Sequence, residues 1–141
     1  MSNPGSAHPM TLFDTASRAM SAQLVRMNTA TSNLANAGTV ATSAATAYRP
    51  LRPVFATVLD NATGLASVKV QGVYQYGATP VQSHDPDNPL ADANGDVWGS
   101  GVDENAEMIE ITDASRQYQN MVEAMQTAKQ LTLDTMRMKT S

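Results

Sequence analysis

The fold is decided near the start of the chain, where residues 12–37 read LFDTASRAMSAQLVRMNTATSNLANA. Large side chains recur there every seven residues, which is typical of a helix face that packs along a partner helix. The members of this face are Phe13, Met20, Met27 and Leu34, with Ala16, Leu24 and Ala30 beside them. Thr11 followed by Asp14 favours a helix start, and Gly38 favours a helix stop. The sequence therefore predicts a helix over 11–37.

The end of the chain carries a matching pattern. One heptad position holds Ile111, Tyr118, Met125 and Thr132, and its companion holds Ala114, Met121 and Ala128. Acidic residues crowd the start of this segment and basic residues its end, which complements a helix dipole. We predict a second helix over 103–141 that pairs with the first one as a coiled-coil-like helical domain, because neither narrow stripe would stabilise a helix alone.

Between the helices, residues 38–102 have a different composition, which predicts a loop and a small β-rich domain. The stretch 37–47 is rich in Ala, Thr and Ser and is expected to be a loop. Residues 49–58 and 67–76 are expected to form a hairpin, with Val70 and Tyr74 on one face. Residues 84–101 are expected to be an irregular loop. The fold class is therefore α+β.

The composition limits what this chain can do. Of its 141 residues, 21 are Ala and 9 are Met, whereas Leu, Ile, Val and Phe together number 24. Such a chain has few large side chains for a core of its own, so we expect it to bury apolar surface against a partner. A net charge of −4 leaves no basic surplus for nucleic acid. Because there is no Cys, disulfides and thiolate chemistry are excluded.

The candidate reactive sites all fail on spacing. An EF-hand needs oxygen ligands at loop positions 1, 3 and 5, with Gly at position 6 and Glu at position 12. Counting from Asp85 puts Leu90 where the Gly must be, and counting from Asp92 puts Val97 there. His84 has no second His nearby, and the serine between two glycines at 99–101 lacks the spacing of a nucleophile elbow. No cofactor and no metal is therefore expected.

Several motifs resemble one known group of proteins. The run Arg26–Ala37, which closes with Asn-Leu-Ala-Asn-Ala, resembles the N-terminal signature of bacterial flagellar rod, hook and related axial proteins. Tyr48-Arg49, the run NPLADANG at 88–95 and the run ASRQYQ at 114–119 are similar, in the same order, to the proximal rod proteins within that family. The resemblance covers essentially residues 11–138.

The resemblance implies a structural, non-enzymatic subunit of the proximal rod, which assembles helically as part of a drive shaft that transmits torque. The alternative is another axial subunit, either a different rod protein or a hook-type protein. Implied partners are copies of itself, other rod proteins, the basal-body membrane ring and the export apparatus, with no nucleic acid and no small-molecule substrate. Implied localisation is the basal body, in the rod that crosses the periplasm.

Two further expectations concern the ends and faces of the chain. Residues 1–10 read as a disordered leader without the features of a secretory signal, which agrees with export without a cleaved signal peptide. Neighbouring subunits are expected to bury the helix faces and the amides that close the first helix. This assembly interface comprises Phe13, Met20, Met27, Asn33, Leu34, Asn36, Ile111, Tyr118, Met121 and Met125.

Overall fold

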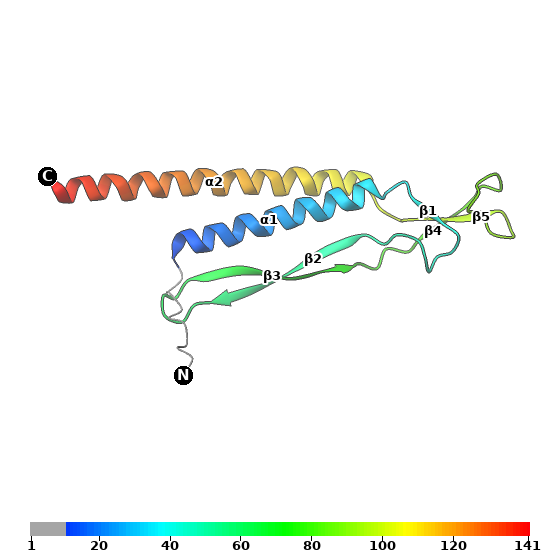
Figure 1. Cartoon of the computed structure of the whole chain (residues 1–141), viewed down its shortest axis with the longest axis horizontal. Helices are drawn as coiled ribbons and strands as arrows, with labels where there is room; N and C mark the ends of the chain where they lie inside the picture. Colours follow the sequence, from blue (N-terminus) through cyan, green and yellow to red (C-terminus); the bar gives the residue numbers. More distant parts are fainter. Residues whose placement is uncertain (1–10) are drawn as a thin grey trace, which may run out of the picture.

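The structure, a computed structural model, describes residues 11–141, so the expected leader at 1–10 lies outside the described residues. Along the chain, all the β-strands come between the two helices, and the molecule is elongated (Figure 1). The elements are α1 (Leu12–Ala35), β1 (Val40–Ala41), β2 (Leu51–Leu59), β3 (Ala66–Gln75), β4 (Val81–His84), β5 (Asp96–Gly99) and α2 (Glu104–Thr140). The predicted α+β class and both terminal helices are confirmed.

The two helices lie side by side and run in opposite directions, because the start of α1 lies against Ala128 whereas Arg26 lies against Glu110. Each helix begins at the predicted cap. The Thr11 hydroxyl accepts a hydrogen bond from the backbone N–H of Asp14. The carboxylate of Asp14 in turn accepts one from the backbone N–H of Thr11. This capping box satisfies two amides that would otherwise lack partners. A coiled-coil geometry for the pair stays a prediction.

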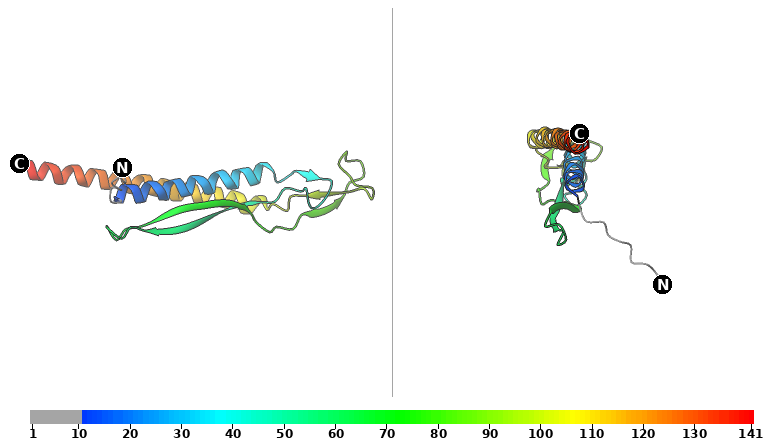
Figure 2. Two further views of the ribbon diagram at one scale, coloured as in Figure 1. Left: turned by 60° about the horizontal axis from the view of Figure 1, so that its bottom comes forward. Right: turned by 90° about the vertical axis from the view of Figure 1, so that its left-hand side faces the viewer.

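Strands β2 and β3 form an antiparallel hairpin that runs along the helix pair (Figure 2). Their register shifts between Val54 and Phe55, where β3 holds one extra residue, Gln71. An extra residue reverses the face that later side chains take. Tyr74 therefore lies on the opposite face from Val70, and the prediction that the two share a face is wrong.

The second sheet has the strand order β1-β5-β4 and lies beyond the start of α2 (Figure 1). The expectations of a plain loop over 37–47 and an irregular loop over 84–101 are therefore wrong in part. Val40 and Ala41 pair with Trp98 and Gly99, and β4 pairs with the same strand from its other side. The physical reason is tertiary pairing, since strands of two to four residues carry too little alternation to be read locally.

The core is as small as the composition predicts. Among the described residues, the buried apolar side chains are Ala22, Ala30, Ala47, Val97, Ala114 and the prolines Pro50 and Pro80. Three of these alanines lie on the helices, where small side chains let helix backbones approach closely. Burying a methyl group stabilises far less than burying a Leu or Phe, so this core contributes little per residue.

Candidate functional site

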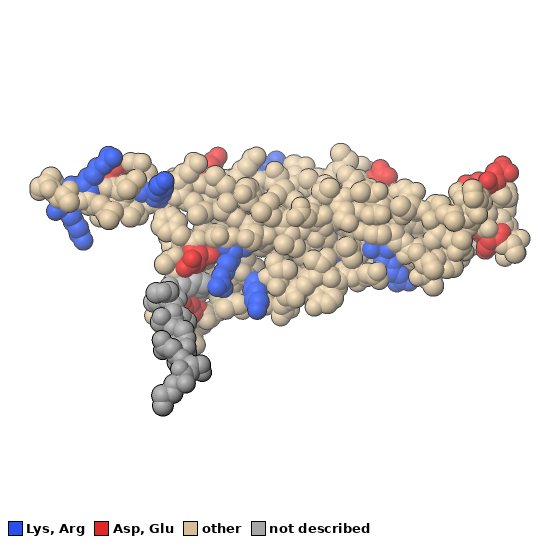
Figure 3. Space-filling model, in the orientation of Figure 1, with Lys and Arg blue, Asp and Glu red and all other residues tan. Residues whose placement is uncertain are grey.

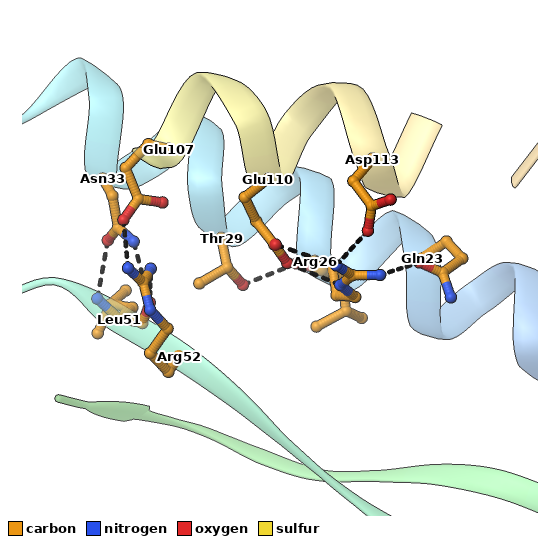
Figure 4. Close-up of polar contacts among 10 residues, drawn as sticks. Gln23, Arg26, Thr29, Asn33, Leu51, Arg52, Glu107, Glu110 and Asp113 are labelled. Atoms are coloured by element: carbon orange, nitrogen blue, oxygen red, sulfur yellow. Dashed lines mark hydrogen bonds and ion pairs between the residues drawn. The ribbon is translucent and has the colours of Figure 1, made fainter. Parts of the chain in front are cut away.

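A fully buried asparagine joins the first helix to the hairpin (Figure 4). Asn33 donates from Nδ2 to the Leu51 carbonyl oxygen at 2.9 Å, and its Oδ1 accepts from the Leu51 backbone N–H at 2.8 Å. The Tyr48 hydroxyl donates to the same Oδ1 at 2.9 Å. One side chain thus provides hydrogen-bond partners for both the N–H and the C=O of Leu51, the first residue of β2. Backbone groups that are shielded from water need such partners.

A buried carboxylate joins the second helix to the same strand. Glu107 is 1% exposed, and its Oε1 accepts a hydrogen bond from Arg52 Nη2 at 2.5 Å. This bond raises the pKa of Arg52 above its ordinary value. The other oxygen, Oε2, has no protein partner among the described residues. Removing Arg52 would therefore leave a buried charge uncompensated.

Arg26 forms the polar link between the two helices. Its Nε and Nη2 donate to the two oxygens of Glu110 at 2.7 and 3.0 Å, and Nη2 also reaches Asp113 at 2.9 Å (Figure 4). The hydrogen bond with Glu110 is the main cause of a raised pKa for Arg26. The Arg26 side chain is 21% exposed, so solvent only partly screens its attraction to the two carboxylates. This geometry fixes the alignment of α1 on α2.

Three residues of the expected assembly interface lie at the contact of the helix pair. Phe13, Met121 and Met125 line an apolar groove of about 240 Å³ between the start of α1 and the middle of α2. Phe13 is 39% exposed, and the other apolar members are half-buried: Met20, Met27, Leu34, Ile111, Tyr118, Met121 and Met125. These side chains keep surface that a neighbouring subunit can cover.

The two asparagines of the expected interface have partners inside the chain. Asn33 is fully buried, so it positions β2 rather than facing a neighbour. Asn36 is half-buried and donates from Nδ2 to the Ser32 carbonyl oxygen at 2.8 Å, which closes the helix. We therefore restrict the interface proposal to the apolar members.

Sequence reasoning missed an exposed apolar surface on the second helix. Ile109 is 70% exposed, and Leu131 and Met138 are 62% and 78% exposed. These residues lie outside the heptad positions that the sequence singled out, and Leu131 and Met138 belong to the part of α2 that continues past the start of α1. A search for large apolar residues off the heptad stripe would have found them.

No further site is evident in the part of the chain that the structure describes. Across residues 11–141, no three His, Cys, Asp or Glu side chains gather in an arrangement suited to a metal ion. Neither described helix has a stretch long and apolar enough to span a bilayer. What the arrangement offers chemically is a rigid helix pair, clasped to a hairpin and bearing apolar surface.

Comparison with known proteins identifies the family. A model described as flagella basal body rod protein matches residues 13–41, and one described as flagellar basal body rod FlgEFG protein C-terminal matches 93–138. The flagellar basal-body rod protein FlgC of Salmonella typhimurium is 41% identical over 129 residues, which cover 90% of this chain and 95% of that protein. The chain belongs to the FlgC family of flagellar basal-body rod proteins.

Other FlgC proteins show the same breadth of similarity. Those of Escherichia coli O157:H7 and Yersinia enterocolitica are 39% and 37% identical over 127 residues, again with 90% of this chain and 95% of each relative covered. The two regions matched by rod models include most of α1 and α2. As a member of the FlgC family, the chain is a structural rod protein of the flagellar basal body.

Proposed function

We propose that this chain is built into the proximal rod through its helix pair and helps to form the shaft that transmits torque. The observation that carries this proposal is apolar helix surface left uncovered in a chain whose buried core is mostly alanine. Burying one Met or Phe side chain contributes about 1.5–3 kcal/mol. Neighbouring subunits can therefore supply, by association, the burial that the single chain lacks.

The groove between the helices is the part of this surface most suited to a neighbouring helix. It is lined by apolar side chains and by small residues, which include Ala16, Ala19 and Ala124. Small residues at a contact permit a close approach of another backbone. The proposed contact residues are Phe13, Met20, Met27, Leu34, Ile111, Tyr118, Met121 and Met125.

The proposed partners are copies of this chain, other rod proteins, the membrane ring and the export apparatus, in a rod that crosses the periplasm. In this role the chain needs no catalytic activity, no cofactor, no nucleic acid and no cleaved signal peptide. The described residues support a mechanical role, because their buried polar groups tie elements together: Asn33 and Glu107 each anchor β2 to a helix.

The test is complementation. A strain that lacks this chain should regain motility when the full chain is supplied, and purified basal bodies should then contain it. A variant with Met125 replaced by Asp should be absent from those basal bodies, whereas Gln126→Asp, a matched change at an exposed position, should be present. Motility without the chain, or its absence from purified rods, would overturn the proposal. A cell-wall digestion assay on the purified protein is expected to show no activity.

A further inference from the structure

A surface groove lies between the first half of α1 and the hairpin of β2 and β3. It has a volume of about 440 Å³, and its lining includes Arg18 and Ser21 from the helix, with Lys69 and Val70 from β3. Figure 3 shows basic side chains close together where α1 meets the hairpin. We call this the basic groove. It shares no lining residue with the apolar groove between the two helices.

The two cations of the basic groove lie on the same side of the hairpin. Arg18 donates from Nη1 to the Ser67 hydroxyl at 3.2 Å, and Ser67 is 5% exposed. Side chains two positions apart point to the same face of a strand, so Lys69 follows Ser67 on that face. The hydrogen bond holds the guanidinium of Arg18 against β3, which reduces the side-chain entropy lost when a partner binds.

Neither cation forms an ion pair within residues 11–141. By contrast, the two arginines that link elements of the fold, Arg26 and Arg52, are paired with carboxylates. Arg18 instead meets a neutral hydroxyl, and the acid one turn before it, Asp14, is held in the capping box. The basic groove therefore has positive charge that a partner with carboxylates can neutralise.

The rest of the lining favours a polypeptide over a free anion. Three valines and two serines lie between and beside the cations. A free phosphate or carboxylate ion would satisfy the charges, but it would leave the valine side chains in contact with water. A polypeptide segment can do both, because small or apolar side chains between its acids can cover the valines.

The chain itself has no segment with this complementary chemistry. Residues 1–10 contain no Asp or Glu. Among the described residues, every acid except Asp87, Glu104 and Glu123 accepts a hydrogen bond within the chain. Those three are far apart in the sequence, so they do not form an acidic segment. The chemistry of the basic groove therefore fits a different protein better than a second copy of this chain.

We propose that the basic groove binds an acidic segment of a different rod protein. The segment has two carboxylates within a few residues, one for Arg18 and one for Lys69, and small or apolar side chains that lie against the valines. The proposal deepens the proposed function and rests on it, since the two proteins meet in the rod. It assigns a partner chemistry to the hairpin side of the molecule, away from the helix-pair contact.

The test is carbodiimide crosslinking of purified basal bodies that contain the unsubstituted chain. The reagent joins a lysine amine to a carboxylate in contact with it. The amide forms with loss of one water, which the carbodiimide takes up to become a urea. The lysines of the chain are Lys69, Lys129 and Lys139, so mass spectrometry of the digested products identifies a crosslink at Lys69. We expect Lys69 joined to a different protein, with a second Asp or Glu within a few residues of the joined one.

Three outcomes would overturn the proposal. These are no crosslink at Lys69 in rods that contain the chain, a crosslink from Lys69 to a second copy of this chain, and a joined segment without a second acid. In each case the proposed function survives, because the chain is in the rod. Failure of the proposed function would appear instead as absence of the unsubstituted chain from purified rods.

A charge reversal adds a second readout, because the amine of Lys69 stays in place. Arg18→Glu should lower the yield of the Lys69 crosslink about fivefold, since it repels the same acidic segment. Arg116→Glu is the matched control, an equal reversal at an exposed position on α2, and it should leave the yield unchanged. Arg18→Gln is scored by the same criteria if Arg18→Glu is absent from rods. Equal yields in the Arg18 and Arg116 variants would overturn the charge pairing.

Discussion

Replacing Asn33 with Ala should destabilise the folded chain more than any other Asn-to-Ala change on the first helix. The side chain is fully buried and holds three hydrogen bonds of 2.8 to 2.9 Å. Two of the partners have alternatives, since the Leu51 carbonyl oxygen also accepts from Arg52 and the half-buried Tyr48 can reach water. The Leu51 backbone N–H would be left without its side-chain acceptor.

A buried donor without a partner costs about 1–3 kcal/mol, and the volume removed adds to this, so we expect a loss of about 2–3 kcal/mol. The measurement is urea unfolding of the purified chain, followed by helical circular dichroism. Asn28→Ala is the matched control, because Asn28 is exposed on the same helix and gains the same helix propensity. It should change the free energy of unfolding by no more than about 0.5 kcal/mol. Equal effects of the two substitutions would refute the assignment of Asn33 as the anchor of β2.

Three further results are expected. Arg52→Met should lower the free energy of unfolding by about 3 kcal/mol in the same assay, because it leaves the buried Glu107 carboxylate without its partner. Adding Glu107→Leu should recover most of this loss. A double variant as unstable as Arg52→Met alone would contradict the pairing. Met125→Asp should prevent incorporation into rods while Gln126→Asp does not, because only the first places an unpaired charge in the apolar groove. The hydrogen bond from the Thr11 backbone is the main cause of a lowered pKa for Asp14. The capping box should therefore stabilise the helix above pH 3.8, and this contribution should be lost as the pH falls through the pKa of Asp14 in the folded chain. Carboxylate titration by NMR measures this, and a midpoint at or above 3.8 would contradict it.

The terminal helices were predictable from sequence because their information is local. Thr11 and Asp14 lie within one turn of each other, and the heptad from Phe13 to Leu34 repeats a single spacing. The observed helix ends lie within two residues of the predicted ones. The hairpin was predictable for the same reason, through two alternating runs on either side of a turn. Fold class therefore needed only short-range patterns.

The anchors and the second sheet were not predictable, because each depends on residues far apart in sequence. Nothing in the run around Asn33 indicates that Leu51 will receive its amide, and the sheet joins Val40 to Gly99 across 59 positions. Glu107 reads as one of several acids at a solvated helix start, yet it is buried. Tertiary contacts decided all three. Similarly, the exposure of Ile109 depends on which side of α2 faces α1.

The small side chains buried on the two helices also have a mechanical consequence. Ala22, Ala30 and Ala114 are buried, and side chains this small offer little resistance to sliding of one helix along its neighbour. A shift by one heptad is about 10 Å, far more than any hydrogen bond can stretch. The ion pairs of Arg26 with Glu110 and Asp113 therefore oppose sliding of one helix along the other. In the proposed shaft, axial shear within a subunit would be resisted at that guanidinium and at the two links to β2, which Asn33 and Glu107 form.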